Sequence, residues 1–473
     1  MQPGNAKSAK IRGYTDKQSV AQGESIRFCI SNLHGSALAY LPIRFVRLGR
    51  IETEVASGVA AVHAHPVPAE RAWENNDWDV SYTLTVDRTW RSGVYVARVG
   101  QGVDEAKDIF FVVKNALPES AAPIVVQIPT TTMNAYNNWG GASLYGYNSA
   151  RSPTHAVSFN RPQQSDPLWP RGYGFESEWD LRIKAFVQWM EMVGYAADFV
   201  TNNDLHECKE LLQPYRLFIS IGHDEYWSRE MRNHFDAFIA GGGNAAIFSG
   251  NTCYWQIRLE PDEKTGAAHR RQVCYKAADK DPTVDPALKT ATWREVGYPE
   301  NLSFGAGFAC GAWRGDGAFG AFTVHHVDHW AFSQTMLRNG DSFGNCADER
   351  LLGYETNAVD HVFDERGIPV PTGADGTPAD YLILALAELP DWSAPGNAAM
   401  GVFTNPQSGG AVFNAATTDW ANGLQACLSG DDPFRTVTAK ITRNVITQLT
   451  SPKSAAKDDR HSPSLSAQSH DAD

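Results

Sequence analysis

Three polar segments of the sequence carry the residue types that can do chemistry. They are residues 130–148, 222–228 and 249–255, and each comes directly after a run of apolar residues. Their side chains include His223, Glu225, Asn251 and several tyrosines. Such groups can transfer a proton, donate a hydrogen bond to a developing oxyanion, or bind a cation through hard oxygen donors. If the three apolar runs are neighbouring strands, these side chains meet in one crevice.

The pattern from residue 124 onward predicts how those strands are arranged. Continuous apolar runs, typical of parallel strands buried on both faces, occur at 124–128, 196–200, 217–221 and 245–249, with later runs at 381–386 and 411–415. Helices are predicted at 176–193, from Ser228 to about 240, and at 436–449. This alternation predicts a doubly wound parallel sheet, in which ligands bind beyond the carboxyl ends of the strands. Residues 290–345 are expected to form a β-rich insertion over that sheet.

Each candidate residue also has a purely structural interpretation. Asp224 or Glu225 can cap the helix that begins at Ser228, because carboxylates favour a helix N-terminus. Asn251 can form a turn with Gly250, and tyrosines in an Asn/Gly-rich loop are usually packing or surface residues. Structural roles are favoured for three further histidines, which are His325, His326 and His329.

Missing motifs narrow the chemistry. The sequence has no Gly-x-Ser-x-Gly nucleophile elbow, no His-Glu-x-x-His zinc helix and no phosphate-binding or dinucleotide-binding glycine motif. Ser220 and Gly222 do not flank a cysteine, so an amidotransferase-type thiol nucleophile is absent there. The nearest thiol, Cys253, lies beyond the following strand.

Residues 10–115 are predicted to form an all-β domain. Short β-branched or aromatic segments, separated by turn residues, occur at 25–30, 43–48, 80–86, 93–98 and 108–113. An immunoglobulin-like antiparallel sandwich is the expected packing. The α/β domain is expected over 120–450, and residues 452–473, polar and without periodicity, are expected to be disordered.

Composition limits the partners and the compartment. A net charge of −13 argues against nucleic acid and anionic membrane surfaces, because phosphates would be repelled. No stretch of eighteen apolar residues occurs. The seven cysteines are scattered and include no Cys-x-x-Cys pair, which favours reduced thiols in a cytoplasmic protein.

Several motifs together resemble the N,N-dimethylformamidase large-subunit family. They are Thr-Met-Asn-Ala-Tyr-Asn-Asn-Trp-Gly-Gly (132–141), Ser-Leu-Tyr-Gly-Tyr (143–147), Gly-His-Asp-Glu-Tyr-Trp-Ser (222–228), Phe-Ser-Gly-Asn (248–251) and Gly-Tyr-Glu-Thr (353–356). The resemblance covers roughly residues 10–450. It implies an amidotransferase-like α/β domain after the sandwich, and an amidohydrolase that cleaves the C–N bond of a small amide or formamide.

The resemblance also implies a mononuclear, ferric, non-haem iron. Its ligands would be Tyr136, Tyr145 and Glu225, with Tyr147 as a rival to Tyr145 in the same motif. Catalytic roles fall to His223, Asn251 and Glu355, where His223 or Glu355 would be the base and Asn251 would donate to the oxyanion. The family's large subunits are longer and pair with a small subunit. An accessory subunit or a homo-oligomer is therefore an expected partner, and the substrate stays open.

Two other functions fit the same sequence. One is a non-catalytic module that binds carbohydrate or another small ligand, because aromatic rings can stack on sugars; the candidate rings are Trp139, Trp169, Trp227 and Trp255. The other is a metal hydrolase that uses zinc or another ion in the same crevice. Oxygen-only ligation disfavours zinc, but His223 could join the ligands.

Overall fold

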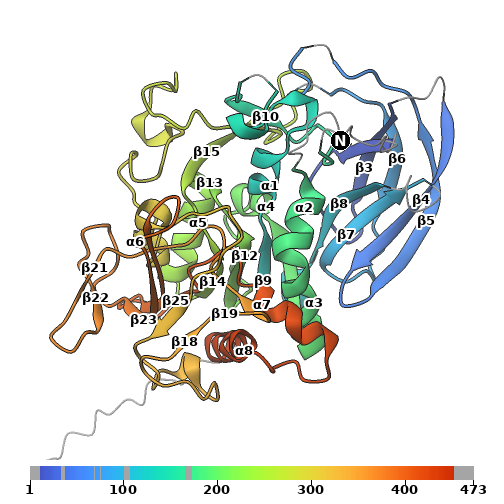
Figure 1. Cartoon of the computed structure of the whole chain (residues 1–473). Coiled ribbons are helices and arrows are strands. Elements are labelled where there is room, and N and C mark those ends of the chain that lie inside the picture. Colours follow the sequence, from blue (N-terminus) through green and yellow to red (C-terminus); the bar gives the residue numbers. More distant parts are fainter. Residues whose placement is uncertain are drawn as a thin grey trace, which may run out of the picture.

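The computed structural model describes residues 11–33, 38–68, 70–74, 76–100, 107–150, 152–165 and 173–451. An all-β region at the N-terminal end lies beside a larger region built on a mixed sheet (Figure 1). The predicted disordered tail, 452–473, lies outside the described residues. Within the described part of the chain, no helix has the length and apolar character needed to cross a bilayer.

Two sheets make up the N-terminal region, a three-stranded one in the order β1-β3-β6 and a five-stranded one in the order β2-β8-β7-β4-β5. The strands are β1 (Ile11–Thr15), β2 (Ser19–Ala21), β3 (Ser25–Asn32), β4 (Ala39–Leu48), β5 (Glu52–Val62), β6 (Val80–Thr85), β7 (Gly93–Val99) and β8 (Lys107–Lys114). The five strands expected from the sequence are present. The expected set lacks β1, β2 and β5. β2 has only three residues, and β5 is an edge strand whose side chains are mostly exposed or half-buried and so carry little apolar signal.

An apolar core fills the space between these two sheets. Phe28, Phe45 and Phe111 are fully buried there, with ring centroids 5.5 Å apart for Phe28–Phe45 and Phe28–Phe111. Burying one such side chain stabilises the fold by about 1.5–3 kcal/mol. The opposite face of the five-stranded sheet, with Val46 and Val94, packs toward the helices of the larger region.

A nine-stranded sheet organises the larger region, in the order β11-β9-β12-β14-β25-β24-β23-β17-β18. The strands are β9 (Ile124–Ile128), β11 (Ala197–Thr201), β12 (Leu217–His223), β14 (Asn244–Gly250), β17 (Phe322–Val324), β18 (Ser342–Phe343), β23 (Leu382–Leu389), β24 (Gly396–Thr404) and β25 (Ala411–Asn414). The pairings from β11 to β25 are parallel, as expected, and the remaining pairings are antiparallel.

The all-parallel prediction is therefore wrong for half of this sheet. β24 was not predicted, and short connections join β23 to β24 and β24 to β25. Such short loops can join only antiparallel neighbours. Part of the predicted insertion, β17 and β18, extends the edge of the sheet rather than covering its face.

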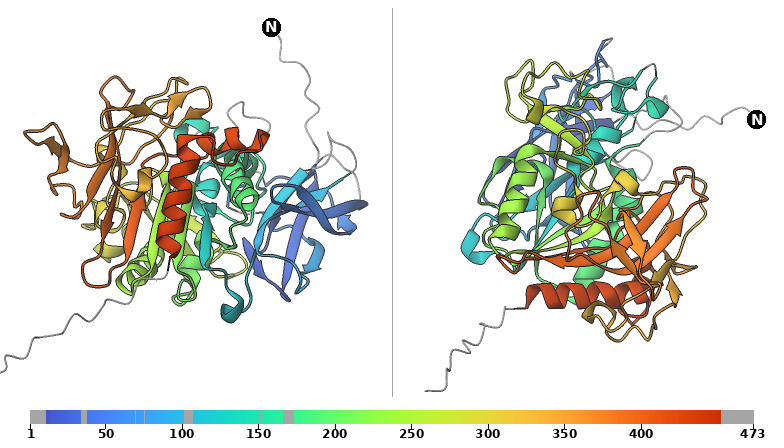
Figure 2. Two further views of the ribbon diagram at one scale, coloured as in Figure 1. Left: turned by 90° about the horizontal axis from the view of Figure 1, so that it is seen from below. Right: turned by 90° about the vertical axis from the view of Figure 1, so that its left-hand side faces the viewer.

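Helices cover both faces of the parallel half (Figure 2). One face carries α3 (Lys184–Val193), α7 (Asn422–Gln425) and α8 (Val437–Thr450), and the other carries α1 (Thr130–Tyr136), α4 (Asn202–Glu207) and α5 (Arg229–Ala240). Successive strand residues alternate between these faces: Val126 and Ile219 belong to the first core, Val125 and Phe218 to the second. The sheet is buried on both sides, which explains its continuous apolar runs.

Smaller elements complete the region. They are α2 (Phe175–Glu178), a π-helical turn (Trp179–Ile183), α6 (Asn301–Phe304), β10 (Ala156–Ser158), β13 (Tyr226–Ser228), β15 (Trp255–Glu260), β16 (Arg271–Val273), β19 (Asn345–Cys346), β20 (Glu349–Arg350), β21 (His361–Phe363) and β22 (Pro369–Pro371). The helix expected over 176–193 is thus interrupted by the π turn. It ends as expected at Gly194, whose φ of 88° suits glycine.

Candidate functional site

The strand order reverses between β9 and β12. The chain leaves β9 to form β11 on one side, and leaves β12 to form β14 on the other. Parallel sheets of this type open a crevice at such a point, beyond the carboxyl ends of the strands. All six predicted site residues lie close together there, and we call them the strand-end cluster: Tyr136, Tyr145, His223, Glu225, Asn251 and Glu355.

Two phenols and one carboxylate form the centre of the cluster. The Tyr136 hydroxyl donates to Glu225 Oε2 at 2.9 Å, and the Tyr145 hydroxyl donates to Glu225 Oε1 at 2.5 Å. The two phenol oxygens lie 3.1 Å apart. Four oxygens from two segments of the chain therefore lie close together. Tyr147, the rival to Tyr145, is half-exposed, whereas Tyr145 donates to Glu225.

Local hydrogen bonds fix the two tyrosines. Tyr136 ends α1, which begins after Pro129, and its carbonyl accepts from Asn148 Nδ2 at 2.8 Å. Ser143 Oγ accepts from the Tyr145 backbone N–H at 2.9 Å. The short loop that carries Tyr145 is thus tied to the end of the helix that carries Tyr136.

Glu225 is not the cap of α5. Ser228 fills that role, since its side chain accepts from the Met231 N–H. The Glu225 backbone N–H donates to Thr132 Oγ1 at 2.9 Å, so α1 holds this loop as well. Asp224 has a structural role, because its carboxylate accepts from neighbouring side chains; these are Gln127, Ser220 and Asn202, at 2.7–3.0 Å.

His223, Glu355 and Asn251 form the second half of the cluster. His223 Nε2 lies 2.8 Å from Glu355 Oε2 and 3.2 Å from Glu225 Oε2. Asn251 Nδ2 donates to Glu355 Oε2 at 3.1 Å. Asn251 also makes the turn expected after β14, with a φ of 48°. Its structural and its predicted functional interpretations are therefore compatible.

A glycine lets the Glu355 segment approach the sheet. A Cβ at Gly250 would lie 2.4 Å from the Thr418 nitrogen and 2.7 Å from the Glu355 carbonyl oxygen. Contacts this short are not tolerated with backbone atoms. Gly250 therefore allows a segment about 100 residues away in the sequence to bring its carboxylate to the end of β14.

Burial and neighbouring charge shift the acid–base properties of the cluster. Burial, followed by the charge of Glu225, raises the pKa of Tyr136 and of Tyr145 well above its usual value. Burial alone would lower the pKa of His223, but Glu355 and Glu225 raise it to about 10. Burial alone would raise the pKa of Glu225, but the hydrogen bond and charge of His223, with the charge of Lys276, lower it. Without a further cation, both phenols are neutral.

The donor set fits a hard cation. The two phenol oxygens lie 3.1 Å apart, and each lies 2.5 or 2.9 Å from a different oxygen of the Glu225 carboxylate. Adjacent donors around one ion are separated by about 2.9 Å when metal–oxygen bonds of about 2.0–2.1 Å meet at right angles. A bound cation would lower the pKa of both phenols and so favour their phenolate form. Among the described residues, this cluster included, no group of three or more His, Cys, Asp and Glu side chains is arranged to hold a metal, so the phenol oxygens are needed to complete the donor set here.

Lys276 belongs to the site and was missed in the sequence. Its ammonium nitrogen lies 3.1 Å from the centre of the Tyr145 ring and within 5.4 Å of the Tyr226 and Trp255 ring centres. Burial lowers its pKa to about 8, while Glu225 and Glu355 favour its charged form. Lys276 follows β16 in no recognisable motif, so only the folded chain brings it to Tyr145.

The tryptophans proposed to stack on sugars are mostly unavailable. Trp139 and Trp227 are fully buried, Trp255 is partly exposed, and Trp169 lies outside the described residues. Burial raises the pKa of the Cys253 thiol well above its usual range, which keeps it protonated and unreactive.

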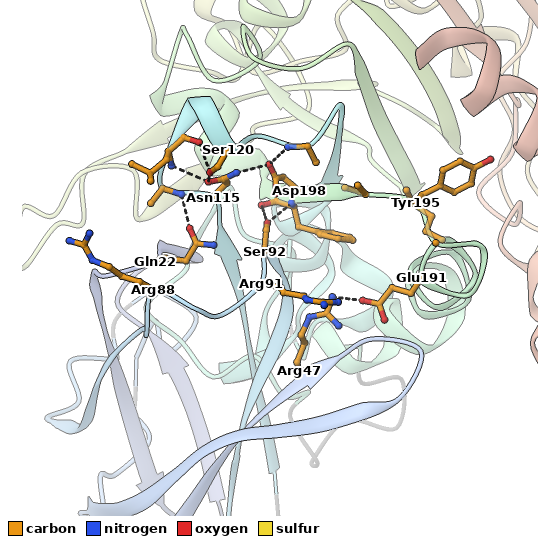
Figure 3. Close-up of a pocket in the computed structure, with 18 residues that line it drawn as sticks. Gln22, Arg47, Arg88, Arg91, Ser92, Asn115, Ser120, Glu191, Tyr195 and Asp198 are labelled. Carbon is orange, nitrogen blue, oxygen red and sulfur yellow. Dashed lines mark hydrogen bonds and ion pairs between the residues drawn. The ribbon is translucent and has the colours of Figure 1, made fainter. Parts of the chain in front are cut away.

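A cavity of about 780 Å³ lies away from the strand-end cluster. It lies between the N-terminal strands and the α3–β11 segment (Figure 3). Its acids already have internal partners: Glu191 pairs with Arg47, and Asp198 accepts from Asn115 Nδ2 at 3.0 Å. These contacts join the two regions, and no group of the strand-end cluster lines the cavity.

Residues 47–433 match the family model described as "N,N-dimethylformamidase beta subunit-like, C-terminal". The chain therefore belongs to the N,N-dimethylformamidase beta subunit-like family. The family resemblance drawn from the motifs is confirmed.

Two relatives are the N,N-dimethylformamidase beta subunits of Alcaligenes sp and Paracoccus aminophilus. Each is 23% identical to this chain over 43% of its length, and the match spans only 31% of the relative. Among solved structures, a cycloisomaltooligosaccharide glucanotransferase of Paenibacillus sp. is 9% identical, covering 73% of this chain and 68% of that one. Its TM-score of 0.18 carries no inference about fold or function.

Proposed function

We propose that this chain is an iron-dependent amidohydrolase that cleaves the C–N bond of a small amide or formamide. The observation that carries the proposal is the arrangement of two phenols and one carboxylate, at 2.5–3.1 Å from one another, beside a His–Glu pair. Membership in the dimethylformamidase family supports the hydrolase class. Dimethylformamide and other small amides are the substrates to test first.

Tyr136, Tyr145 and Glu225 would hold one iron, expected to be ferric because phenolate and carboxylate are hard anionic donors. Bound there, iron would supply a Lewis acid that polarises the amide carbonyl and lowers the pKa of a water. The protein's part is to keep the three donors together: α1 and the Ser143 turn fix the tyrosines, and Thr132 fixes Glu225.

Proton transfer would fall to Glu355 and His223. Glu355 is the carboxylate of the cluster outside the ligand set, so it can accept the proton of the attacking water. His223 Nε2 lies between both carboxylates and can pass that proton to the leaving amine. Asn251 Nδ2 can donate to the developing oxyanion, an interaction worth about 3 kcal/mol. The Lys276 ammonium would offset the negative charge that the ligands gather.

The finer fold assignment is also proposed. The two sheets that enclose an apolar core support an immunoglobulin-like sandwich over 10–115. The parallel half of the nine-stranded sheet supports an amidotransferase-like domain over 120–450. All seven cysteines are free thiols, which supports a cytoplasmic location. The relatives are named as beta subunits, which supports an accessory subunit or a homo-oligomer as partner.

The first experiment measures metal content and the visible absorption spectrum of the purified protein. About one iron per chain and a tyrosinate-to-iron charge-transfer band are expected, followed by turnover of small amides. A colourless protein that stays free of iron after reconstitution would refute the mechanism. Such a protein with a sugar-dependent melting shift would be a binding module.

A matched pair of variants tests the ligand assignment. Glu225→Ala should lose iron while the protein stays folded. Glu349→Ala removes another buried carboxylate, one that accepts from the Thr438 N–H at 2.7 Å at the start of α8. It should keep iron. Full iron retention in Glu225→Ala would rule out Glu225 as a ligand.

A further inference from the structure

A buried ion pair lies directly behind the strand-end cluster. Glu178 ends α2, and Arg182 lies in the π-helical turn that follows. Arg182 Nη1 donates to Glu178 Oε2 at 3.1 Å and to the Tyr173 hydroxyl at 2.9 Å. The side chains are 1% and 9% exposed for Glu178 and Arg182. Removing two charges from water is costly, so this pair is not explained by stability alone. π turns also occur frequently at functional sites.

On one side, the partners of Arg182 reach the metal-binding half of the cluster, which is Tyr136 and Tyr145. The Tyr173 hydroxyl bonds to both Glu178 and Arg182. The Tyr173 ring centre lies 5.6 Å from that of Tyr136. Arg182 is therefore linked to Tyr136 by its hydrogen bond to Tyr173 and by the contact between the Tyr173 and Tyr136 rings.

On its other side, Arg182 reaches the proton-transfer half of the cluster, which is His223 and Glu355. Its guanidinium carbon lies 4.8 Å from the centre of the Tyr354 ring. That ring meets the edge of His223 at 5.9 Å, and Tyr354 directly precedes Glu355 in the chain. The guanidinium lies over the Tyr354 ring, and that ring meets the His223 ring edge to face, so these contacts run from the π turn to the site.

A second connection runs through Asp419. Arg182 Nε lies 3.9 Å from Asp419 Oδ1, and Asp419 Oδ2 accepts from the Gly353 N–H at 3.0 Å. The backbone that leads into Glu355 is thus held from the same arginine.

Close packing makes this support rigid. At Gly222, where φ is 72°, an added Cβ would lie 3.1 Å from Arg182 Cβ. The end of β12, which carries His223, therefore packs directly on the π turn.

We infer that Arg182 is a positioning residue that sets the separation between the metal-binding half, Tyr136 and Tyr145, and the proton-transfer half, His223 and Glu355. The inference rests on the proposed function. Arg182 contacts neither the phenol and carboxylate oxygens of Tyr136, Tyr145 and Glu225 nor the His223–Glu355 pair. It acts through Tyr173, Tyr354 and Asp419. Its guanidinium can bond in a plane and stack on a ring at once, which a lysine ammonium cannot do.

Three variants test this role. Arg182→Met removes the charge, and Glu178→Gln/Arg182→Met avoids leaving the Glu178 carboxylate without its arginine. Arg182→Lys keeps the charge but loses the stack. The control is Arg98→Met, which removes an arginine–carboxylate pair with Asp108 at 2.7 Å in the N-terminal region, where both side chains are partly exposed. The double variant and the control should both fold and keep about one iron per chain.

The expected result is a kcat lower by about 10- to 100-fold in the Met variants, as for residues that orient metal ligands. KM should change little, the charge-transfer band should shift, and Arg182→Lys should recover only part of the loss. Arg98→Met should match the wild type in all three measurements. Unchanged kcat and band position in the double variant would overturn the inference, as would full recovery by lysine.

A metal-free measurement separates this inference from the proposed function. The imidazole N–H proton of His223, assigned by its loss in His223→Gln, should give a downfield NMR signal because His223 lies 2.8 Å from Glu355. In the iron-free double variant this signal should move, while in Arg98→Met it should not. A wild type that binds no iron refutes the proposed function, and an unmoved His223 signal refutes the role of Arg182.

Discussion

The two regions of the chain differ in what they bury. Among the described residues of 11–114, Arg12 is the only buried charged residue, and the core is formed by apolar side chains such as Phe28 and Phe45. Beyond residue 124, buried charges gather at the ends of the parallel strands; they include Glu178, Arg182, His223, Glu225 and Glu355. Apolar burial is favourable by itself, whereas a buried charge needs a partner.

This difference indicates that the two regions have separate roles, one in stability and one in the chemistry of the site. The N-terminal region can lose a contact and change only its stability. In the α/β region, each buried charge is held by several others, so a single change alters the chemistry of its neighbours. The four predictions below test that separation.

The largest effect is expected for Tyr145→Phe. The phenol oxygen lies 2.5 Å from Glu225 Oε1, so its removal should weaken the charge-transfer band and lower kcat by about 1,000-fold or more. Tyr147→Phe is the matched control, because Tyr147 is half-exposed. Iron titration and steady-state kinetics measure both. If Tyr147→Phe lost iron and Tyr145→Phe kept it, Tyr147 rather than Tyr145 would be the ligand.

Asn251→Ala should lower kcat by about 100- to 1,000-fold with little change in KM, as for the loss of one oxyanion donor. Asn251 has a φ of 48°, which alanine tolerates poorly. Asn251→Gly removes the side chain without that strain, so it should be equally inactive but more stable to urea. Normal activity in Asn251→Gly would show that the side chain takes no part.

Phe45→Ala should lower the free energy of unfolding by about 3–5 kcal/mol, because it empties part of the N-terminal core. Iron content and kcat per folded chain should stay unchanged. Tyr40→Ala, at a residue 71% exposed, should change stability by less than about 0.5 kcal/mol. Calorimetry and metal analysis measure the pair. Loss of iron from folded Phe45→Ala would contradict the proposal that the N-terminal core affects only stability.

Glu230→Gln tests a charge of the α/β region that lies away from the strand ends. The hydrogen bond from His206 lowers the pKa of Glu230 to about 2. A carboxyl with a lowered folded-state pKa stabilises the fold above its unfolded pKa, about 4.3, and this contribution disappears as pH falls through about 2. Because Glu230 is half-exposed, the difference at pH 7 should be under about 1 kcal/mol. Urea unfolding at pH 7 and at pH 2 measures it, and an equal difference at both pH values would contradict the pKa.

Much of the fold follows from local pattern. The apolar run at 124–128, the helix cap at Ser228 and the stop at Gly194 all occur where the sequence placed them. Each depends on residues a few positions apart, because strand and helix periods and caps are local properties. The exposed edge strand β5 and the added strand β24 lacked such a signal.

The sequence alone determined that His223, Glu225 and Asn251 follow buried strands, and neighbouring parallel strands bring their carboxyl ends to one edge. Only the tertiary structure decided that the Tyr145 hydroxyl donates to Glu225, and that Lys276 and Arg182 flank the cluster. These contacts join segments from tens of residues to more than a hundred apart, through loops without periodicity. Their geometry depends on packing such as the close approach at Gly250, which no local pattern encodes.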